Sequence, residues 1–200
     1  LTLVLRAEAA SAPTLASDLI ALVGKTSAAV DAWDVASVVG TAAELRTLYT
    51  LDAATITWLG DEALEITGTP SAAEANAVAL LTTGAVTATL ASGTAAELNA
   101  ALTETSVNAW TLTVTDSSAS LADLNALNGK TSLDISVLLL DEVTGTPAEL
   151  TTLLDGRPML SASPGVPGFV DFHGDERIIL TGTVTAADAN AAAAATNGMV

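Results

Sequence analysis

Gly40-Thr41-Ala42-Ala43-Glu44-Leu45 is the first of three nearly identical stretches in this chain; the others span residues 93–98 and 145–150. Looser copies occupy residues 16–19, 71–75, 120–124 and 185–189. The acidic residue of the motif stands at positions 18, 44, 74, 97, 123, 149 and 188. The spacing between successive copies is therefore mostly close to one common value, and self-similarity of this kind is typical of repeat architectures. The sequence predicts one continuous repeat array over residues 1–200, with about seven coils.

Each copy of the motif has the form of a helix N-terminus. In Thr41-x-x-Glu44 the hydroxyl can accept a hydrogen bond from the third helical amide, while the carboxylate accepts one from the backbone N–H of the cap. The same reciprocal pairing is expected at five further places: Ser71/Glu74, Thr94/Glu97, Ser120/Asp123, Thr146/Glu149 and Thr185/Asp188. A short helix of two to three turns is predicted after each cap, and such helices are marginal unless they pack on something.

The segments before the caps alternate between apolar and polar residues, as strands do. Val86–Leu90 and Trp110–Thr115 show this pattern clearly, and Ile135–Leu140 is a further, more apolar strand candidate. We therefore expect an α/β solenoid with a period of about 26 residues, within the range of known repeat proteins. Each coil would contribute one parallel strand and one short capped helix. The strands would form a continuous sheet on one face, with the helices covering the other.

Composition excludes several classes of protein. The formal charge of −17 and the six scattered Lys and Arg residues do not provide the basic patch that nucleic acid requires. Cysteine is absent, so neither disulfides nor thiolate chemistry are available. No apolar run is long enough for a membrane span, and no targeting signal is visible. Only 3% of the residues are aromatic, which suits thin stacked layers of Ala, Leu, Val and Ile.

The motif Val143-Thr144-Gly145-Thr146-Pro147-Ala148-Glu149-Leu150 and its copies resemble the degenerate V-T-G-T-x-A-E-L tandem arrays of very large secreted or surface proteins of bacteria, cyanobacteria among them. This resemblance implies an extracellular or cell-surface location. Leucine-rich repeats share the strand-plus-helix plan more distantly, but their leucine and asparagine signature is missing here.

One segment departs from the repeat. Residues 156–176 are rich in Pro and Gly and contain the single histidine, and they are expected to be a loop insertion between the last two coils. Asp171, His173 and Asp175 could together supply oxygen and nitrogen ligands to a metal, with calcium as a candidate ion. Acidic residues in loops are more often simply solvated, so the favoured interpretation is a plain insertion without a cofactor.

Candidates for enzyme chemistry are weak. Gly24-Lys25-Thr26 and Gly129-Lys130-Thr131 resemble the end of a phosphate-binding loop, but the upstream glycine that such a loop needs is leucine in both copies. The repeated carboxylates are already explained by helix capping, and a single histidine leaves little for acid–base catalysis. The sequence therefore favours a protein that is not an enzyme.

Two kinds of function remain. The first is a structural module of an extracellular filament, surface layer or adhesin, in which open solenoid ends lead to self-association or continuation into further repeats. The second is recognition of glycan, ice or a protein partner by a flat, threonine-bearing sheet face. The candidate residues of that face are Thr87, Thr89, Thr111 and Thr113. Threonine is also simply a good residue on a half-exposed strand, and that interpretation is the simpler one.

Overall fold

The computed structural model describes residues 3–4, 13–137, 139–154, 170–171, 175–196 and 200. Within these ranges the chain is an α/β protein with seven helices and mostly parallel strands. By its internal contacts the chain divides into two compact units, Leu1–Leu90 and Ala91–Val200. Each unit has its own strands and helices.

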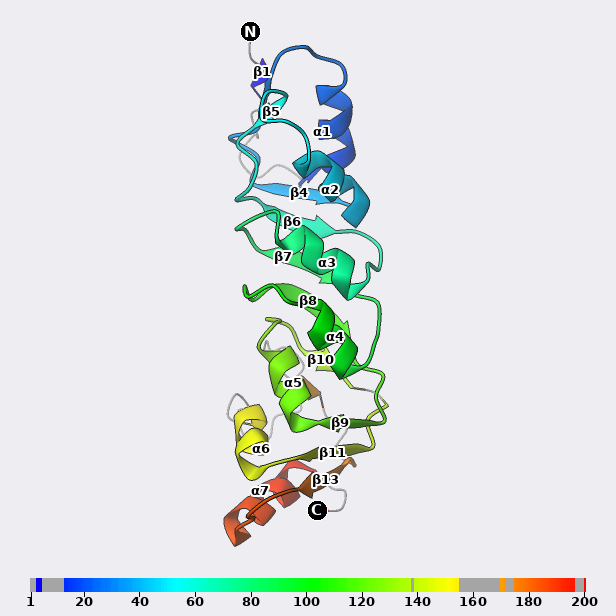
Figure 1. Ribbon diagram of the computed structural model, residues 1–200, viewed down its shortest axis with the longest axis vertical. Helices are drawn as coiled ribbons and strands as arrows, with labels where there is room; N and C mark the ends of the chain where they lie inside the picture. Colours follow the sequence, from blue (N-terminus) through cyan, green and yellow to red (C-terminus); the bar gives the residue numbers. More distant parts are fainter. Residues whose placement is uncertain (1–2, 5–12, 138, 155–169, 172–174, 197–199) are drawn as a thin grey trace. The chain divides into compact units, whose positions relative to one another are not determined.

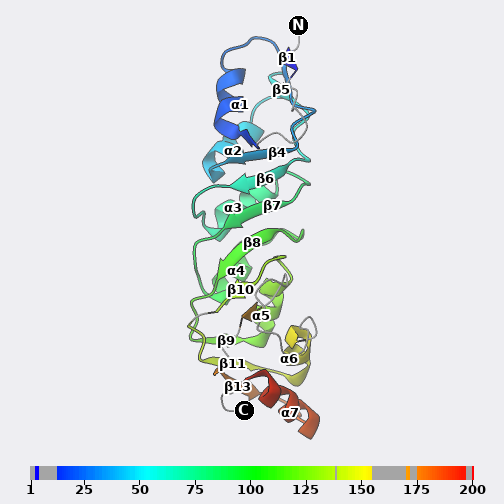
Figure 2. The same cartoon turned by 180° about the vertical axis from the view of Figure 1, so that it is seen from behind.

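Within the described residues, the first unit contains two parallel ladders and three helices. Figures 1 and 2 show α1, α2 and α3 following one another beside the strands. One ladder joins the two-residue strands β1 (Leu3–Val4), β3 (Val30–Asp31) and β5 (Ile56–Thr57). The other joins β2 (Thr14–Leu15), β4 (Ser37–Gly40), β6 (Ala63–Ile66) and β7 (Val86–Thr89). Helices α1 (Ala16–Val23), α2 (Ala42–Tyr49) and α3 (Ala72–Ala79) pack in chain order beside these ladders.

The second unit repeats this plan. Its first ladder joins β8 (Ala109–Thr113), β10 (Ile135–Ser136) and β12 (Val170–Asp171). Its second ladder joins β9 (Ser118–Ser120), β11 (Glu142–Gly145) and β13 (Arg177–Leu180). Helices α4 (Ala95–Ala101), α5 (Leu121–Asn128), α6 (Pro147–Leu154) and α7 (Ala186–Ala195) pack each against the next.

The period of the sequence is visible in the strand register. Ser37 of β4 lies beside Ala63 of β6, and Val30 of β3 lies beside Ile56 of β5, so each of these partners is one repeat further along the chain. Each helix buries apolar residues against the strands, as Leu45 and Leu48 do on one side of α2. The cores are accordingly thin layers of aliphatic side chains.

The prediction of one strand per helix is wrong in detail. Two strands, a short one and a longer one, separate α1 from α2, α2 from α3, α4 from α5 and α5 from α6. The predicted strand at Ile135–Leu140 also ends early, because β10 stops at Ser136 and Leu139 is 60% exposed. Such a short strand contains no complete alternation of apolar and polar positions, so periodicity does not detect it.

Candidate functional site

The repeated acidic residues cap helices. In α2, α3, α4 and α7 the hydroxyl at the N-cap accepts from the third helical amide and the acidic side chain accepts from the N-cap N–H. Thr146 and Glu149 make both bonds before α6, at 3.3 and 2.7 Å. Before α5, the Ser120 hydroxyl accepts from the Asp123 amide and donates to the Asp123 carboxylate. Capping by the hydroxyl is therefore confirmed at all six pairs, and the reciprocal bond from the N-cap N–H is found at five of them, the exception being Ser120 and Asp123.

These bonds stabilise the charged form of the acids. The backbone N–H of Thr41 and then its hydroxyl hold the pKa of Glu44 below its usual range, and Thr94 does the same for the pKa of Glu97. For Glu74 and Asp188 the hydroxyl of the cap is the larger cause of the lowered pKa. A carboxylate whose pKa is lowered in the folded state contributes stability above its unfolded pKa, and that contribution is lost as the pH falls through the folded pKa.

We therefore expect the free energy of unfolding to decrease as the pH falls below about 4.3, the pKa of glutamate in unfolded chains. Glu97→Gln keeps a capping side chain that cannot titrate, so its stability should depend less steeply on pH in this range. Urea unfolding of the two proteins at several pH values measures the difference. Glu65→Gln, at an exposed strand position outside the caps, is the matched control. Identical slopes for Glu97→Gln and the wild type would contradict the prediction.

The candidate threonines lie on two strands, Thr87 and Thr89 on β7 and Thr111 and Thr113 on β8. In β7 the alternation is confirmed, because Thr87 and Thr89 are exposed while Val86 and Ala88 are buried. The register partner of Thr87 on β6 is Glu65, not a hydroxyl residue. In β8, Thr111 is exposed and Thr113 is half-buried beside Ser136 of β10. The structure therefore shows short threonine pairs on two separate strands.

The candidate metal ligands cannot be assembled into a site. His173 lies outside the described residues, as do residues 156–169 of the predicted insertion, and for Asp171 only the backbone position in β12 is described. Asp175 is exposed. Across the described ranges, no group of three or more His, Asp or Glu side chains is placed to hold a metal ion. Whether a cation binds in this segment stays a prediction.

A more distinctive surface lies at the last repeat of the second unit. Strand β13 pairs with β11 alone in its ladder, so its other edge carries unpaired backbone groups over the part of the chain that the structure describes. Such an edge is a template for pairing with another strand. Beside it, α7 packs against α6 and buries only Ala192 among its described side chains. In contrast α5, which packs between α4 and α6, buries Leu121, Leu124 and Leu127.

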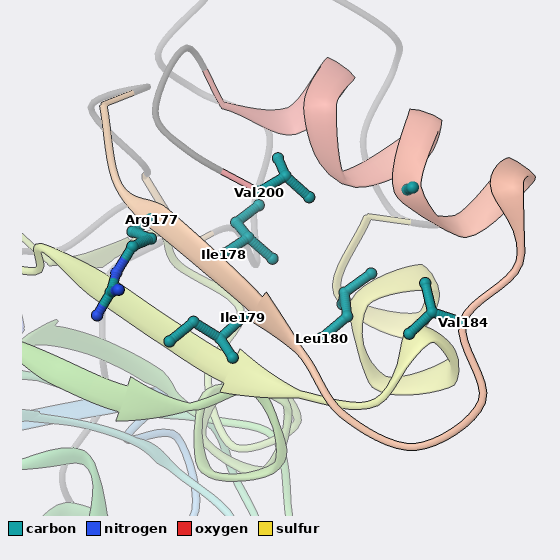
Figure 3. Close-up of a pocket in the computed structure, with 7 residues that line it drawn as sticks. Arg177, Ile178, Ile179, Leu180, Val184 and Val200 are labelled. Atoms are coloured by element: carbon teal, nitrogen blue, oxygen red, sulfur yellow. The ribbon is translucent and has the colours of Figure 1, made fainter.

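The side chains around this edge are mostly apolar and line an open hollow of about 480 Å³ (Figure 3). Its lining residues are Arg177, Ile178, Ile179, Leu180, Val184, Ala189 and Val200. Ile179 and Leu180 are half-buried, and Val184 is 41% exposed. On β11 the register partners of Ile179 and Leu180 are Thr144 and Gly145, so the larger apolar residues stand on the edge strand. We call this surface, from β13 and α7, the edge face.

Two contacts hold the edge face in place. The hydroxyl of Thr196, just after α7, donates to the carbonyl of Glu176, just before β13, over 2.6 Å. Arg177 at the start of β13 forms an ion pair with Glu142 of β11. The first contact ties the two elements of the edge face to each other, and the second ties β13 to β11.

The chain was also compared with known proteins. No family model, curated protein or solved structure matches it. In the described part of the chain, no helix is both long and apolar enough to cross a membrane.

Sequence reasoning missed the edge face as a particular set of residues. It expected open solenoid ends in general, but nothing in the period indicates which of the edge strands in the described structure belongs to such an end. The contrast between the leucines of α5 and the alanines of α7 is the one signal in the sequence that could have indicated it.

Proposed function

We propose that this chain is a non-enzymatic structural repeat module, an α/β solenoid whose edge face packs against a further coil. The observation that carries the proposal is the edge of β13, which is unpaired within the described residues, together with the half-buried Ile179 and Leu180 on this strand. A coil added there would extend both the strand ladder and the helix row by one step, as β11 and α6 do one step earlier. The occupant is a repeat unit of the same kind, from a second copy or from a longer chain.

An extracellular or cell-surface assembly is the setting that we propose, as a filament, surface layer or adhesin. The resemblance of the repeats to tandem arrays of large bacterial surface proteins supports it. The charge of −17 also supports it, since a strong net charge keeps a chain with an apolar edge soluble before it assembles. We propose no resident cofactor; calcium in the segment around His173 is an additional proposal that isothermal titration of the full chain can test.

Recognition through the threonine face receives less support. Glu65 interrupts the hydroxyl row beside Thr87, and a surface complementary to ice or to a regular glycan lattice needs repeated hydroxyl positions. We therefore favour stacking through the edge face over binding through the threonines.

Assembly of the full chain tests the proposal. We expect sedimentation velocity to show larger species as the protein concentration rises, and electron microscopy to show end-to-end rods or fibres. Ile179→Lys should reduce this association by about tenfold or more, because a charge buried in a new interface is strongly unfavourable. Val107→Lys, at a residue that is 58% exposed elsewhere in the second unit, is the control and should assemble normally. A monodisperse monomer at all concentrations, or equal effects of both variants, would contradict stacking through the edge face.

A further inference from the structure

Two of the three tryptophans lie on the surface of the first unit. Trp33 and Trp58 are 68% and 61% exposed, whereas Trp110 in the second unit is 2% exposed. The rings of Trp33 and Trp58 contact each other edge to face, with centroids 5.1 Å apart and planes at 89°. Two perpendicular rings form a corner with aromatic walls that solvent can reach. Exposed aromatic clusters of this kind mark binding surfaces more often than isolated surface side chains do.

The backbone at Trp58 is unusual. Its φ is 66°, and it is the only non-glycine residue with a positive φ among those that the structure describes. A bulky residue in this conformation is a genuine outlier, and strained residues of this kind cluster at functional sites. Core packing does not explain the choice of tryptophan here, because most of the side chain is exposed. Glycine would adopt the same conformation without strain.

The loop that carries Trp58 is held rigidly. The buried carboxylate of Glu62 accepts hydrogen bonds from the Tyr49 hydroxyl at 2.6 Å and from the Gly60 amide at 2.8 Å. The Gly60 carbonyl accepts from the Thr83 amide at 2.8 Å, and the Glu62 carbonyl accepts from the Thr82 hydroxyl at 2.7 Å. These bonds anchor the backbone directly after Trp58 to α2 and to the segment before β7. This preorganisation lowers the entropic cost of binding.

A hollow of about 380 Å³ adjoins Trp58. Tyr49 and Thr57 line it together with aliphatic residues such as Leu51 and Ile56. Burial, and after it the hydrogen bond to Glu62, raises the pKa of Tyr49. The Tyr49 hydroxyl therefore stays protonated and continues to hold the Glu62 carboxylate. The wall of the hollow is largely apolar, which suits an aliphatic segment of a ligand.

The surroundings of the corner are acidic. Asp31 and Asp34 flank Trp33 in the sequence, and the Asp31 carboxylate accepts from the Trp33 amide at 3.1 Å. Asp52 stands in the sequence between Leu51 and Ala53, which both line the hollow. Asp61 is close enough to Tyr49 for its charge to raise the pKa of the Tyr49 hydroxyl. Among the described residues no ion pair occupies any of these four carboxylates. The charge of the site therefore favours a positively charged occupant.

We propose that the Trp33–Trp58 corner binds the side chain of a lysine or arginine from a basic partner polypeptide. The cation lies against the exposed indole faces, where the negative face of the ring attracts it, and nearby carboxylates add to this attraction. The aliphatic stem packs along the apolar wall of the hollow, as the stems of these side chains commonly do. This site lies in the first unit and does not depend on stacking through the edge face.

Nuclear magnetic resonance titration of the full chain tests the proposal with a defined probe. The probe is a short oligolysine peptide, and its control is the same peptide with every lysine acetylated, which keeps the stem but removes the charge. The three indole N–H signals report separately: those of Trp33 and Trp58 should shift, while that of the buried Trp110 should not. We expect the acetylated peptide to bind about tenfold more weakly or worse, and binding of oligolysine to weaken as salt is added.

Variants distinguish binding at the Trp33–Trp58 corner from general electrostatic attraction of oligolysine to an acidic protein. Trp58→Gly removes the ring but suits the positive φ, so its melting temperature should stay the same or rise while oligolysine affinity falls about tenfold. Leu80→Ala, at a residue that is 66% exposed in the same unit, should bind like the wild type. Unchanged affinity in Trp58→Gly, or equal binding of a neutral sugar such as maltose, would overturn the proposal. The variant Ile179→Lys should retain oligolysine binding, so failure of stacking and failure of this site are distinguishable.

Discussion

Replacing Trp110 with alanine is expected to destabilise the second unit by about 3–5 kcal/mol, the range measured when large buried aromatic residues are truncated. Trp110 is the largest fully buried side chain in the described structure. The Thr131 hydroxyl hydrogen-bonds both backbone groups of Trp110. It accepts from the Trp110 N–H at 3.1 Å and donates to the Trp110 carbonyl at 2.7 Å. Because the backbone is fixed, the strand cannot readily collapse into the space that the ring leaves.

The side chains around Trp110 also cannot readily fill the cavity that the lost ring leaves. The buried residues along the same ladder are aliphatic, such as Leu112 and Ile135, and no other buried side chain among the described residues is aromatic. Urea unfolding followed by far-ultraviolet circular dichroism measures the effect. Trp33→Ala is the matched control, because its side chain is 68% exposed and the loss of its contact with Trp58 should cost only about 1.5 kcal/mol or less. Similar losses for the two variants would contradict the assignment of Trp110 to the core.

The second large effect concerns Gly84, just before β7. A Cβ atom added at Gly84 would lie 2.3 Å from the carbonyl oxygen of Glu62 and 2.7 Å from that of Asp61. Both are backbone atoms, so no side chain can turn aside to make room. Gly84→Ala should therefore separate β7 from the loop before β6 and cost about 1–3 kcal/mol or more, as overpacking generally does.

The control for this variant is Gly24→Ala, in the same unit. Gly24 ends α1 with a φ of −68°, and an added Cβ would lie 3.6 Å from its nearest neighbour, which is an ordinary contact. This substitution should be neutral or slightly stabilising, because alanine restricts the unfolded chain. Thermal unfolding of both variants checks the contrast. If Gly84→Ala melts at the wild-type temperature, the close approach of these two backbone segments is incorrect.

The helices were predictable because their signals are local. A cap such as Thr94 and its partner Glu97 lie within one helical turn, and their hydrogen bonds need no information from the rest of the chain. The shortest strands were not predictable, because β3 or β10 is defined by its neighbours in the ladder rather than by its own residues. Pairing of one repeat with the next is a property of three-dimensional stacking that a short segment does not encode.

The Trp33–Trp58 corner could be predicted from the sequence only in part. The separation of Trp33 and Trp58 along the chain is close to one period, so stacking of successive repeats could have predicted that they are neighbours. The exposure of both rings and the positive φ of Trp58 could not have been predicted, because they depend on how the loops after β3 and β5 leave their strands. The edge face was hidden for a related reason, since it is defined by a missing neighbour.

The ladders tolerate unequal spacing along the chain. Ile135 of β10 is adjacent to Leu112 of β8, which precedes it by less than one period, and also to Val170 of β12, which follows it by clearly more than one. Lengthening a connection raises its closure cost only slowly, by about 0.6 kcal/mol for each doubling. Foreign segments could therefore be grafted between α6 and β12 while the strand register is kept. The chain could therefore carry an inserted peptide at this one connection without unfolding the neighbouring repeats.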